Sequence, residues 1–159
     1  MKAVIQRVIR SSVSVEDEVI SSIGRGLCVF IGISRDDTKK DMEFIARKIL
    51  SLRLFEDATG RKWGAGAKDR RLEVLCVSQF TLCSALKGNK LDFHDAMPSD
   101  RSQQFYDEFL ALLRSNYEAD LVKDGKFGAY MEVNIVNDGP VTVEIESPRR
   151  NKPADQQED

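Results

Sequence analysis

Residues 129–146 read AYMEVNIVNDGPVTVEIE and carry the clearest structural pattern in the sequence. Apolar and polar side chains alternate before Asn137, and the same alternation resumes after Pro140. A period of two is typical of a β-strand with one buried face. Because Asn, Asp, Gly and Pro at 137–140 are typical of a tight turn, we predict a β-hairpin or a closely related turn here.

Similar reasoning extends to the rest of the chain. β-Branched and apolar runs predict further strands over 3–15, 19–23, 27–33, 52–55 and 72–80. One helix is expected from a cap at Asp36 or Asp37 to about Leu50, and a second begins with Ser99 as its cap. Strands predominate and do not alternate regularly with helices. This predicts an α+β fold with a mainly antiparallel, barrel-like sheet and two principal helices.

Composition excludes several classes of protein. The 159 residues suit one domain, and the formal net charge of −2 argues against a strongly basic nucleic-acid coat. Neither a membrane-spanning run nor a signal peptide is recognisable, so a cytoplasmic protein is expected. The three cysteines form no CxxC pair and there is one histidine, so we expect reduced core thiols, no metal and no cofactor. Residues 148–159 are predicted to be a disordered polar tail after a domain spanning 1–147.

Few residues are candidates for catalysis or for ligand binding. His94 lies between two aspartates as a possible general base, although a surface loop histidine is the more usual interpretation. Ser78-Gln79-Phe80-Thr81 end a buried strand, where they could hydrogen-bond a ligand or simply cap the strand. In Gly139-Pro140, glycine allows close backbone approach and proline makes a cis peptide bond inexpensive, at about 0.5–1 kcal/mol. An ordinary turn remains the alternative.

Six motifs in order give the sequence a family resemblance. They are MKAVIQRV at 1–8, IGRGLCVFIGIS at 23–34, SQFTL at 78–82, KGNK at 87–90, KDGKFGAYM at 123–131 and NDGPVT at 137–142. Together they resemble the D-aminoacyl-tRNA deacylase family of the eukaryotic cytosolic kind, over Met1 to about Ser147. Leu91 is a departure, because the family more often has proline after KGNK.

The resemblance implies hydrolysis of the ester between a D-amino acid, or mischarged glycine, and the tRNA 3′ end. It implies a homodimer with active sites at the interface, no cofactor, and catalysis assisted by the RNA instead of a side-chain nucleophile. The implied roles are a pocket lined by Ser78, Gln79, Phe80 and Thr81; chiral selection by a cis Gly139-Pro140 pair from the partner; orientation of that pair by Arg7; and adenosine binding by Phe127, Tyr130 and Met131. Phosphate contacts could come from Lys87, Lys90, Lys123 and Lys126.

Two other functions stay open at this point. One is a non-catalytic protein that binds tRNA or DNA ends, which the lysines and the basic start of the tail would suit. The other is a hydrolase that uses His94 as its base.

Overall fold

A six-stranded sheet forms the body of the computed structural model, which describes residues 1–149. Its strands are β1 (Lys2–Val15), β2 (Glu18–Ile23), β3 (Gly26–Gly32), β4 (Glu73–Ser78), β7 (Val122–Asp124) and β8 (Glu132–Glu146). The long strand β1 pairs antiparallel with β2, β3 and β8, whereas β3–β4 and β4–β7 are parallel pairs. This arrangement confirms the α+β prediction.

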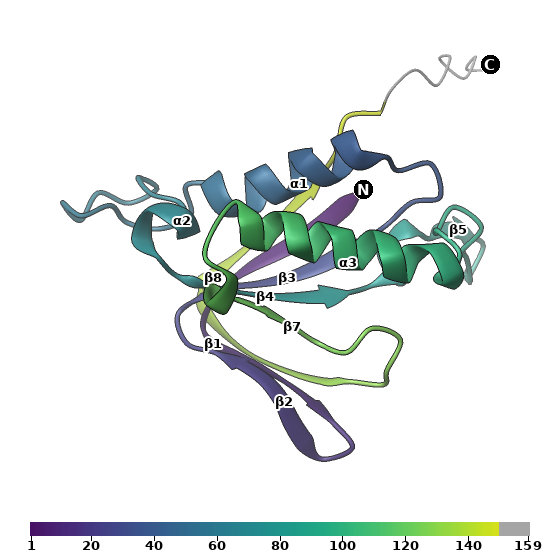
Figure 1. Cartoon of the computed structure of the whole chain (residues 1–159), viewed down its shortest axis with the longest axis horizontal. Helices are drawn as coiled ribbons and strands as arrows, with labels where there is room; N and C mark the ends of the chain where they lie inside the picture. The colour runs from purple at the N-terminus through teal and green to yellow at the C-terminus, as the bar shows by residue number, and fades with distance from the viewer. Residues whose placement is uncertain (150–159) are drawn as a thin grey trace.

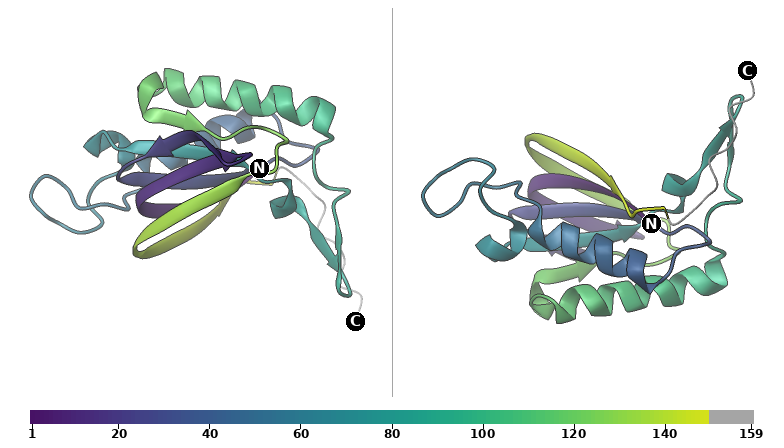
Figure 2. Two further views of the ribbon diagram at one scale, coloured as in Figure 1. Left: turned by 90° about the horizontal axis from the view of Figure 1, so that it is seen from below. Right: turned by 90° about the horizontal axis from the view of Figure 1, so that it is seen from above.

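Two helices cover one face of the sheet, α1 (Lys39–Ser51) and α3 (Ser99–Ser115) (Figure 1). A short helix α2 (Ala67–Arg70) and two 3-10 turns, η1 (Phe80–Cys83) and η2 (Ala119–Leu121), complete the helical elements. A small hairpin of β5 (Ala85–Lys87) and β6 (Lys90–Asp92) projects away from the body (Figure 2). Within residues 1–149, no helix is both long enough and apolar enough to cross a membrane.

The predicted hairpin at 129–146 is wrong, because β8 continues through the turn in one direction. Its second half pairs with the start of β1, where Lys2 faces Glu146, and its first half pairs with the end of β1, where Ser14 faces Glu132. The register shifts between these halves, so 137–140 form a bulge on a single strand. Alternation with a period of two is the same whether a chain reverses or continues, which explains the error.

Both helix caps also differ from the prediction. Thr38 precedes α1, and the Asp41 carboxylate accepts its main-chain N–H at 2.8 Å. Asp37 instead accepts hydrogen bonds from the Met1 amine at 2.6 Å and the Ser34 N–H at 2.7 Å. Ser99 is the first residue of α3 and follows Pro98, so it is not the cap. Asp37 was misassigned because its long-range partner Met1 cannot be recognised from local sequence.

Two further segments depart from the prediction. The strand expected at 52–55 is a loop in which Phe55 alone makes a bridge, to Ala65. A run of four residues with two buried side chains, Leu54 and Phe55, cannot specify a strand by pattern alone. Conversely, the β5–β6 hairpin around KGNK was not predicted, because its strands are only three residues long.

Two apolar clusters lie on opposite faces of the sheet. Beneath the helices, Ile45 of α1 and Phe109 of α3 are fully buried in the same cluster as Ile5 and Val29 of the sheet. The smaller cluster on the other face contains the buried residues Val8, Val13, Ile23, Cys28, Leu75 and Val77. Burial raises the pKa of all three cysteine thiols, which are free and inside the protein, as predicted for core residues.

Candidate functional site

The predicted pocket residues 78–81 lie where a buried strand leaves the sheet. Ser78 is the last residue of β4 and faces Ile31 of β3. The Gln79 N–H donates to the Ile31 carbonyl at 2.7 Å, which fixes the main chain at the start of η1. This strand-end segment is therefore positioned by backbone pairing with β3.

The segment presents two free main-chain donors. Phe80 and Thr81 open η1, and the first N–H groups of a helix have no acceptor within it. Within residues 1–149, no hydrogen bond from either N–H is found. The Gln79 side-chain amide donates to the Thr81 hydroxyl oxygen at 2.6 Å, which occupies one of its lone pairs. The segment therefore offers N–H groups to a ligand, and the Thr81 hydroxyl has no base beside it among the described residues.

The predicted Gly139-Pro140 turn is exposed on the bulge of β8, and its peptide bond is cis, as predicted. Gly139 adopts a φ of +124°, which side chains of L-residues rarely allow. A Cβ atom on Gly139 would lie 3.1 Å from Nη2 of Arg7 and 3.0 Å from Cγ2 of Val141. Glycine is thus required here by both conformation and space.

Arg7 holds the turn from the neighbouring strand β1. Its Nε donates to the Asp138 carbonyl at 3.2 Å, and its Nη1 donates to the Leu54 carbonyl at 2.6 Å. The guanidinium also lies 5.7 Å from the centre of the Trp63 ring. The structure therefore brings Arg7 and the turn together, as the sequence predicted.

The three predicted adenosine-binding residues occupy different environments. Phe127 is half-buried against Tyr106, with ring centres 5.7 Å apart, and Met131 is half-buried on the opposite face of the sheet. Tyr130 is 92% exposed. The three residues share one loop but do not form one surface. Beneath Phe127, the Tyr106 hydroxyl donates to Asp124 at 2.5 Å, and burial raises the pKa of both groups.

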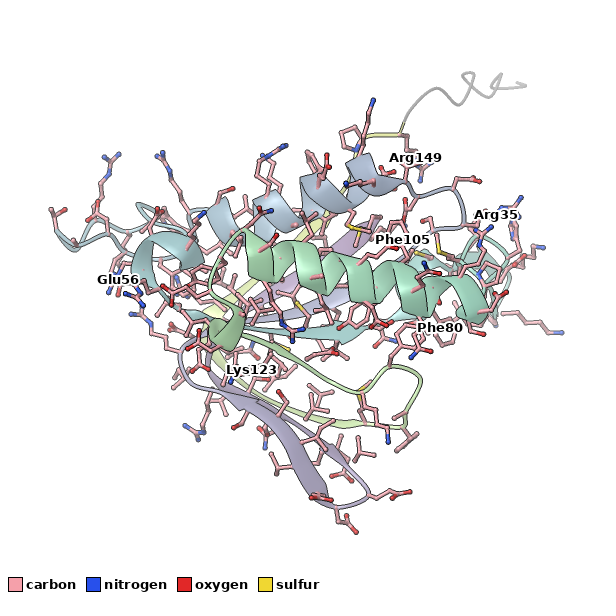
Figure 3. All side chains as sticks on the ribbon, viewed as in Figure 1. Arg35, Glu56, Phe80, Phe105, Lys123 and Arg149 are labelled. Carbon is pink, nitrogen blue, oxygen red and sulfur yellow. The ribbon has the colours of Figure 1, made fainter. Side chains whose placement is uncertain are left out.

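The strand-end segment and the turn lie far apart in one chain. The strand register gives the distance between them. The bulge of β8 lies opposite Arg7 of β1, and Arg7 pairs with Leu27 of β3. Leu27 pairs with Val74 of β4, which is four residues before Ser78. The offset is therefore about 13 Å along the strands, and three strand spacings add about 14 Å across the sheet. In Figure 3, Phe80 and Glu56 lie on opposite sides of the molecule, and Glu56 pairs with Arg25, which in turn contacts Asp138 of the turn.

Other candidate residues lie outside both regions. The His94 ring contacts Asp92 at 2.9 Å and Asp95 at 3.3 Å on the surface. Lys87 and Lys90 belong to the β5–β6 hairpin, whereas Lys123 and Lys126 lie on and after β7. Hence the lysines form two separate pairs. No group of three His, Cys, Asp or Glu residues that could hold a metal is found within 1–149.

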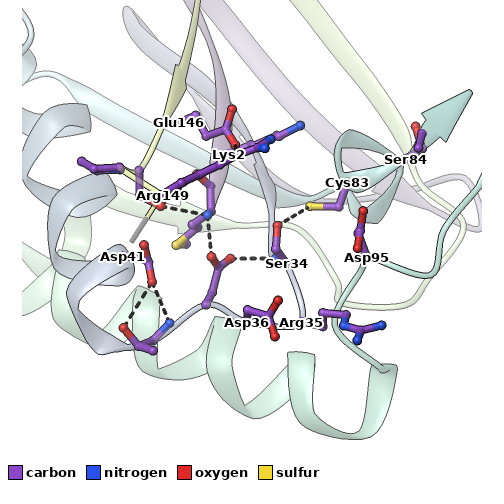
Figure 4. A pocket seen from close by; sticks show the side chains of 16 residues that line it. Lys2, Ser34, Arg35, Asp36, Asp41, Cys83, Ser84, Asp95, Glu146 and Arg149 are labelled. Atoms are coloured by element: carbon purple, nitrogen blue, oxygen red, sulfur yellow. Dashed lines mark hydrogen bonds and ion pairs between the residues drawn. The ribbon is translucent and has the colours of Figure 1, made fainter. Parts of the chain in front are cut away.

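A cavity of about 370 Å³ borders the end of η1 (Figure 4). It contains the Met1 amine, which is paired with Asp37, and it is lined by charged groups of both signs. None of the predicted site residues lines this cavity. The Met1 amine donates to Asp37, in the loop before α1, and to the Ser147 hydroxyl, so these two groups anchor the chain terminus.

Sequence reasoning missed the side chains that surround the turn. Arg25, Glu56 and Trp63 come from two loops distant in sequence, and no local motif connects them with the turn. The only hint is that Arg25 lies between Gly24 and Gly26. Tyr106 was likewise missed, because its spacing on α3 matches an ordinary core position.

Comparisons with known proteins agree on one family. The family model for D-Tyr-tRNA(Tyr) deacylase matches residues 4–146. The chain is 60% identical to D-aminoacyl-tRNA deacylase 1 of Homo sapiens over 93% of this chain and 71% of the human protein. It is 56% identical to D-aminoacyl-tRNA deacylase of Drosophila melanogaster over 94% of each chain.

Two solved structures share the fold. One, named c-Myc DNA Unwinding Element Binding Protein, has a TM-score of 0.91 and 59% identity, covering 94% of this chain and all 100% of its own. The other, described as a probable eukaryotic D-amino acid tRNA deacylase, has a TM-score of 0.77 and 19% identity over 92% of this chain and 98% of its own. At 19% identity, the second match shows only that the two proteins share a fold.

Proposed function

We propose a mechanism from one premise: the chain belongs to the D-Tyr-tRNA(Tyr) deacylase family and is a D-aminoacyl-tRNA deacylase, a hydrolase of translation proofreading. Its substrate is the ester between a D-amino acid and the 3′-terminal ribose of tRNA. The proposal concerns which residues cleave this ester and which reject the L-enantiomer.

Cleavage is assigned to the strand-end segment. The free N–H groups of Phe80 and Thr81 would stabilise the oxyanion, an interaction typically worth about 3–4 kcal/mol per donor. Water is the attacking group, and the neighbouring 2′-hydroxyl of the substrate helps to position it. Attack by Thr81 is disfavoured, because its hydroxyl accepts a bond from Gln79 and has no neighbouring base among the described residues.

Selection of the D-enantiomer is assigned to the turn of a second copy of the chain. The observation that carries this step is the offset of about 13 Å along the strands between the turn and Ser78. One ester cannot contact both regions of one chain. A homodimer, in which each exposed turn reaches the strand-end segment of its partner, brings the two together.

The turn would select the D-enantiomer by sterically excluding the side chain of the L-enantiomer. The main-chain carbonyls of Gly139 and Pro140 hold the substrate ammonium, so that an L side chain points into the turn and a D side chain points to open space. Steric exclusion by backbone can exceed the 10- to 200-fold or so that a pocket achieves by sensing one methylene. This geometry tolerates many D-amino acids and also admits achiral glycine on tRNA.

The terminal adenosine is assigned to the loop at 125–131. Phe127 is half-buried and backed by Tyr106, so one side of its ring could support a base. Met131 and Tyr130 complete the predicted set. Tyr130 is the most exposed of the three and would contact the substrate from the surface.

The test combines turnover and complementation. The chain should release D-tyrosine from D-tyrosyl-tRNA at catalytic concentrations and leave L-tyrosyl-tRNA intact. Phe80→Pro removes one N–H at a helix start, where proline is tolerated, and Gly139→Ala disrupts the turn. Each variant alone should lose most of its activity, whereas mixing the two should restore about a quarter of all sites, because random exchange makes about half of the dimers mixed and each mixed dimer has one intact site. No recovery in dimers shown to be mixed would contradict a shared site.

DNA binding is a second candidate function, which the name of one structural relative favours. The net charge of −2 argues for a weak electrostatic contribution. Binding to single- and double-stranded DNA at 150 mM salt, compared with binding to deacylated tRNA, would test it. Affinity for DNA equal to that for tRNA would support this second function.

A further inference from the structure

Asp138, which precedes Gly139 in the sequence, is contacted by two arginines: Arg7 of β1 and Arg25 of the loop between β2 and β3. Arg7 Nε lies 3.4 Å from Oδ2 of Asp138, and Arg25 Nε lies 4.0 Å from the same oxygen. Arg25 stands at the junction of β2 and β3, on the opposite side of β1 from β8. Asp138 is thereby flanked by two guanidinium groups, one from β1 and one from the loop that joins β2 to β3.

Arg25 is itself fixed by a second layer of contacts. Its Nη2 donates to Oε1 of Glu56 at 2.8 Å, and its guanidinium lies 5.5 Å from the centre of the fully buried Phe55 ring. Glu56 is in turn held by Arg70 of α2, which hydrogen-bonds its main-chain carbonyl and lies 3.8 Å from its carboxylate. The hydrogen bond from Arg25 also lowers the pKa of Glu56, so this carboxylate is charged at neutral pH.

We propose that Arg25 and Glu56 are positioning residues for chiral selection: they hold Asp138, and with it the Gly139-Pro140 turn, against the loop at 56–65. The proposal rests on the proposed function of the turn. It adds that a chain of contacts, Arg70 to Glu56 to Arg25 to Asp138, sets where the turn carbonyls point when the turn enters the partner.

The solvent exposure of these side chains distinguishes a role in positioning the turn from a role in stabilising the fold. The side chains of Arg25, Glu56 and Arg70 are 37%, 38% and 30% exposed. Ion pairs at such positions contribute little to the free energy of unfolding, because solvent screens them. Their loss should therefore change the geometry of the turn much more than the stability of the fold. Since a displacement of about 1 Å can cost about 10²-fold in rate, selectivity is the sensitive measurement.

The test compares Arg25→Gln and Glu56→Gln in the full chain. The measurement is the ratio of kcat/KM for D-tyrosyl-tRNA to that for L-tyrosyl-tRNA, with the melting temperature recorded in parallel. Arg25→Gln should lower the ratio by roughly tenfold or more, and Glu56→Gln by less, because the second variant leaves the Asp138 contact in place. The double variant should be no worse than Arg25→Gln, since both changes break one chain of contacts.

Arg71→Gln is the matched control. Arg71 pairs with Glu118 at 2.9 Å on the surface, away from the turn, and its loss should leave the ratio unchanged. An unchanged ratio in a folded Arg25→Gln protein would overturn the proposal, and if that variant does not fold, Glu56→Gln decides in its place. Gly139→Ala separates the two levels: if it too leaves the ratio unchanged, the function assigned to the turn has failed.

Discussion

The strand-end segment at 78–81 and the turn at 137–140 are built in opposite ways. Main-chain hydrogen bonds to β3 fix the first at the end of a buried strand. The second is an exposed bulge that side chains hold, foremost Arg7. Groups proposed for bond cleavage are therefore positioned by the main chain of the fold itself, whereas groups proposed for selectivity depend on a few charged residues.

This difference predicts how the two regions respond to substitution. Removing a side chain at the strand end leaves the N–H donors in place, because the backbone pairing does not involve it. Removing a support of the turn leaves the turn present but displaced. Substitutions in the turn region should therefore have larger effects on the reaction than substitutions of strand-end side chains.

Gly139→Ala should have the largest effect. The added Cβ would crowd the side chains of Arg7 and Val141, and alanine rarely adopts the φ of +124° found here, so the turn should be strained and displaced. We expect hydrolysis of D-tyrosyl-tRNA to fall by about 10²-fold or more, measured by single-turnover kinetics.

Gly88→Ala is a matched control for this change. Gly88 also has a positive φ, +62°, but a Cβ there would meet no atom within 4 Å. Its replacement imposes strain without a collision, and activity should stay near that of the unmodified chain. Equal losses in the two variants would mean that the effect of Gly139→Ala is not specific to the turn.

Arg7→Ala should have the second-largest effect. It removes the donors to the Asp138 and Leu54 carbonyls, and we expect a loss of about 1–3 kcal/mol in the free energy of unfolding together with weaker rejection of the L-enantiomer. Urea denaturation and the ratio of D- to L-hydrolysis measure the two effects. Arg10→Ala, at an exposed position on the same strand, should change neither. Intact L-rejection in Arg7→Ala would remove the distinction drawn between the two regions.

Much of the fold could be predicted from sequence because local pattern determined it. β-Branched residues marked the strand β1, alternating side chains marked β8, and the apolar faces of α1 and α3 marked the helices. The direction of β8 could not be predicted, because a bulge and a reversal leave the same alternation. Strand order also escaped prediction, since it depends on pairings such as Lys2 with Glu146 that are distant in sequence.

The candidate site was predictable to the extent that family motifs carried it. Arg7 and Gly139-Pro140 meet in the structure as expected, and their contact joins residues more than a hundred positions apart. The supports Arg25 and Glu56 were not found, because they lie in loops whose chemistry becomes visible only when the chain is folded. Family motifs therefore indicated the residues of the turn, whereas the residues that hold the turn in place could be identified only from the folded structure.

Thr81→Ala should have a smaller effect than either turn variant. It removes a hydroxyl that accepts one bond from Gln79 but leaves both N–H donors of the segment. We expect kcat to fall by no more than about tenfold, since a single hydrogen bond contributes about 0.5–1.5 kcal/mol. Thr81→Val, which keeps the shape of the side chain, is the control for packing. Complete loss of hydrolysis with intact substrate binding would make Thr81 a nucleophile and reverse the comparison.

The smallest expected effect is a response to acid confined to the hairpin beside the strand-end segment. Asp92 pairs with Lys87, and it also accepts hydrogen bonds from the main-chain N–H and the ring of His94. These contacts, the bond to Lys87 first, hold the pKa of Asp92 well below its ordinary value of 3.8. A lowered folded-state pKa stabilises the hairpin above pH 3.8, and this stabilisation disappears as the pH falls through the lower value. Amide exchange in β5 and β6, corrected for intrinsic rates, should therefore accelerate below about pH 4 while exchange in β4 does not.

Asp92→Asn sharpens this last prediction, because it removes the charge at every pH. The variant should show faster exchange in β5 and β6 already at pH 6, and lowering the pH should add little. Activity at pH 7 should change less than in any variant of the turn, because the main chain at 78–81 is held by β3 and not by the hairpin. If Asp92→Asn weakened hydrolysis as much as Arg7→Ala, the strand-end segment would also depend on charged supports, and the contrast between a backbone-built and a side-chain-held region would no longer hold.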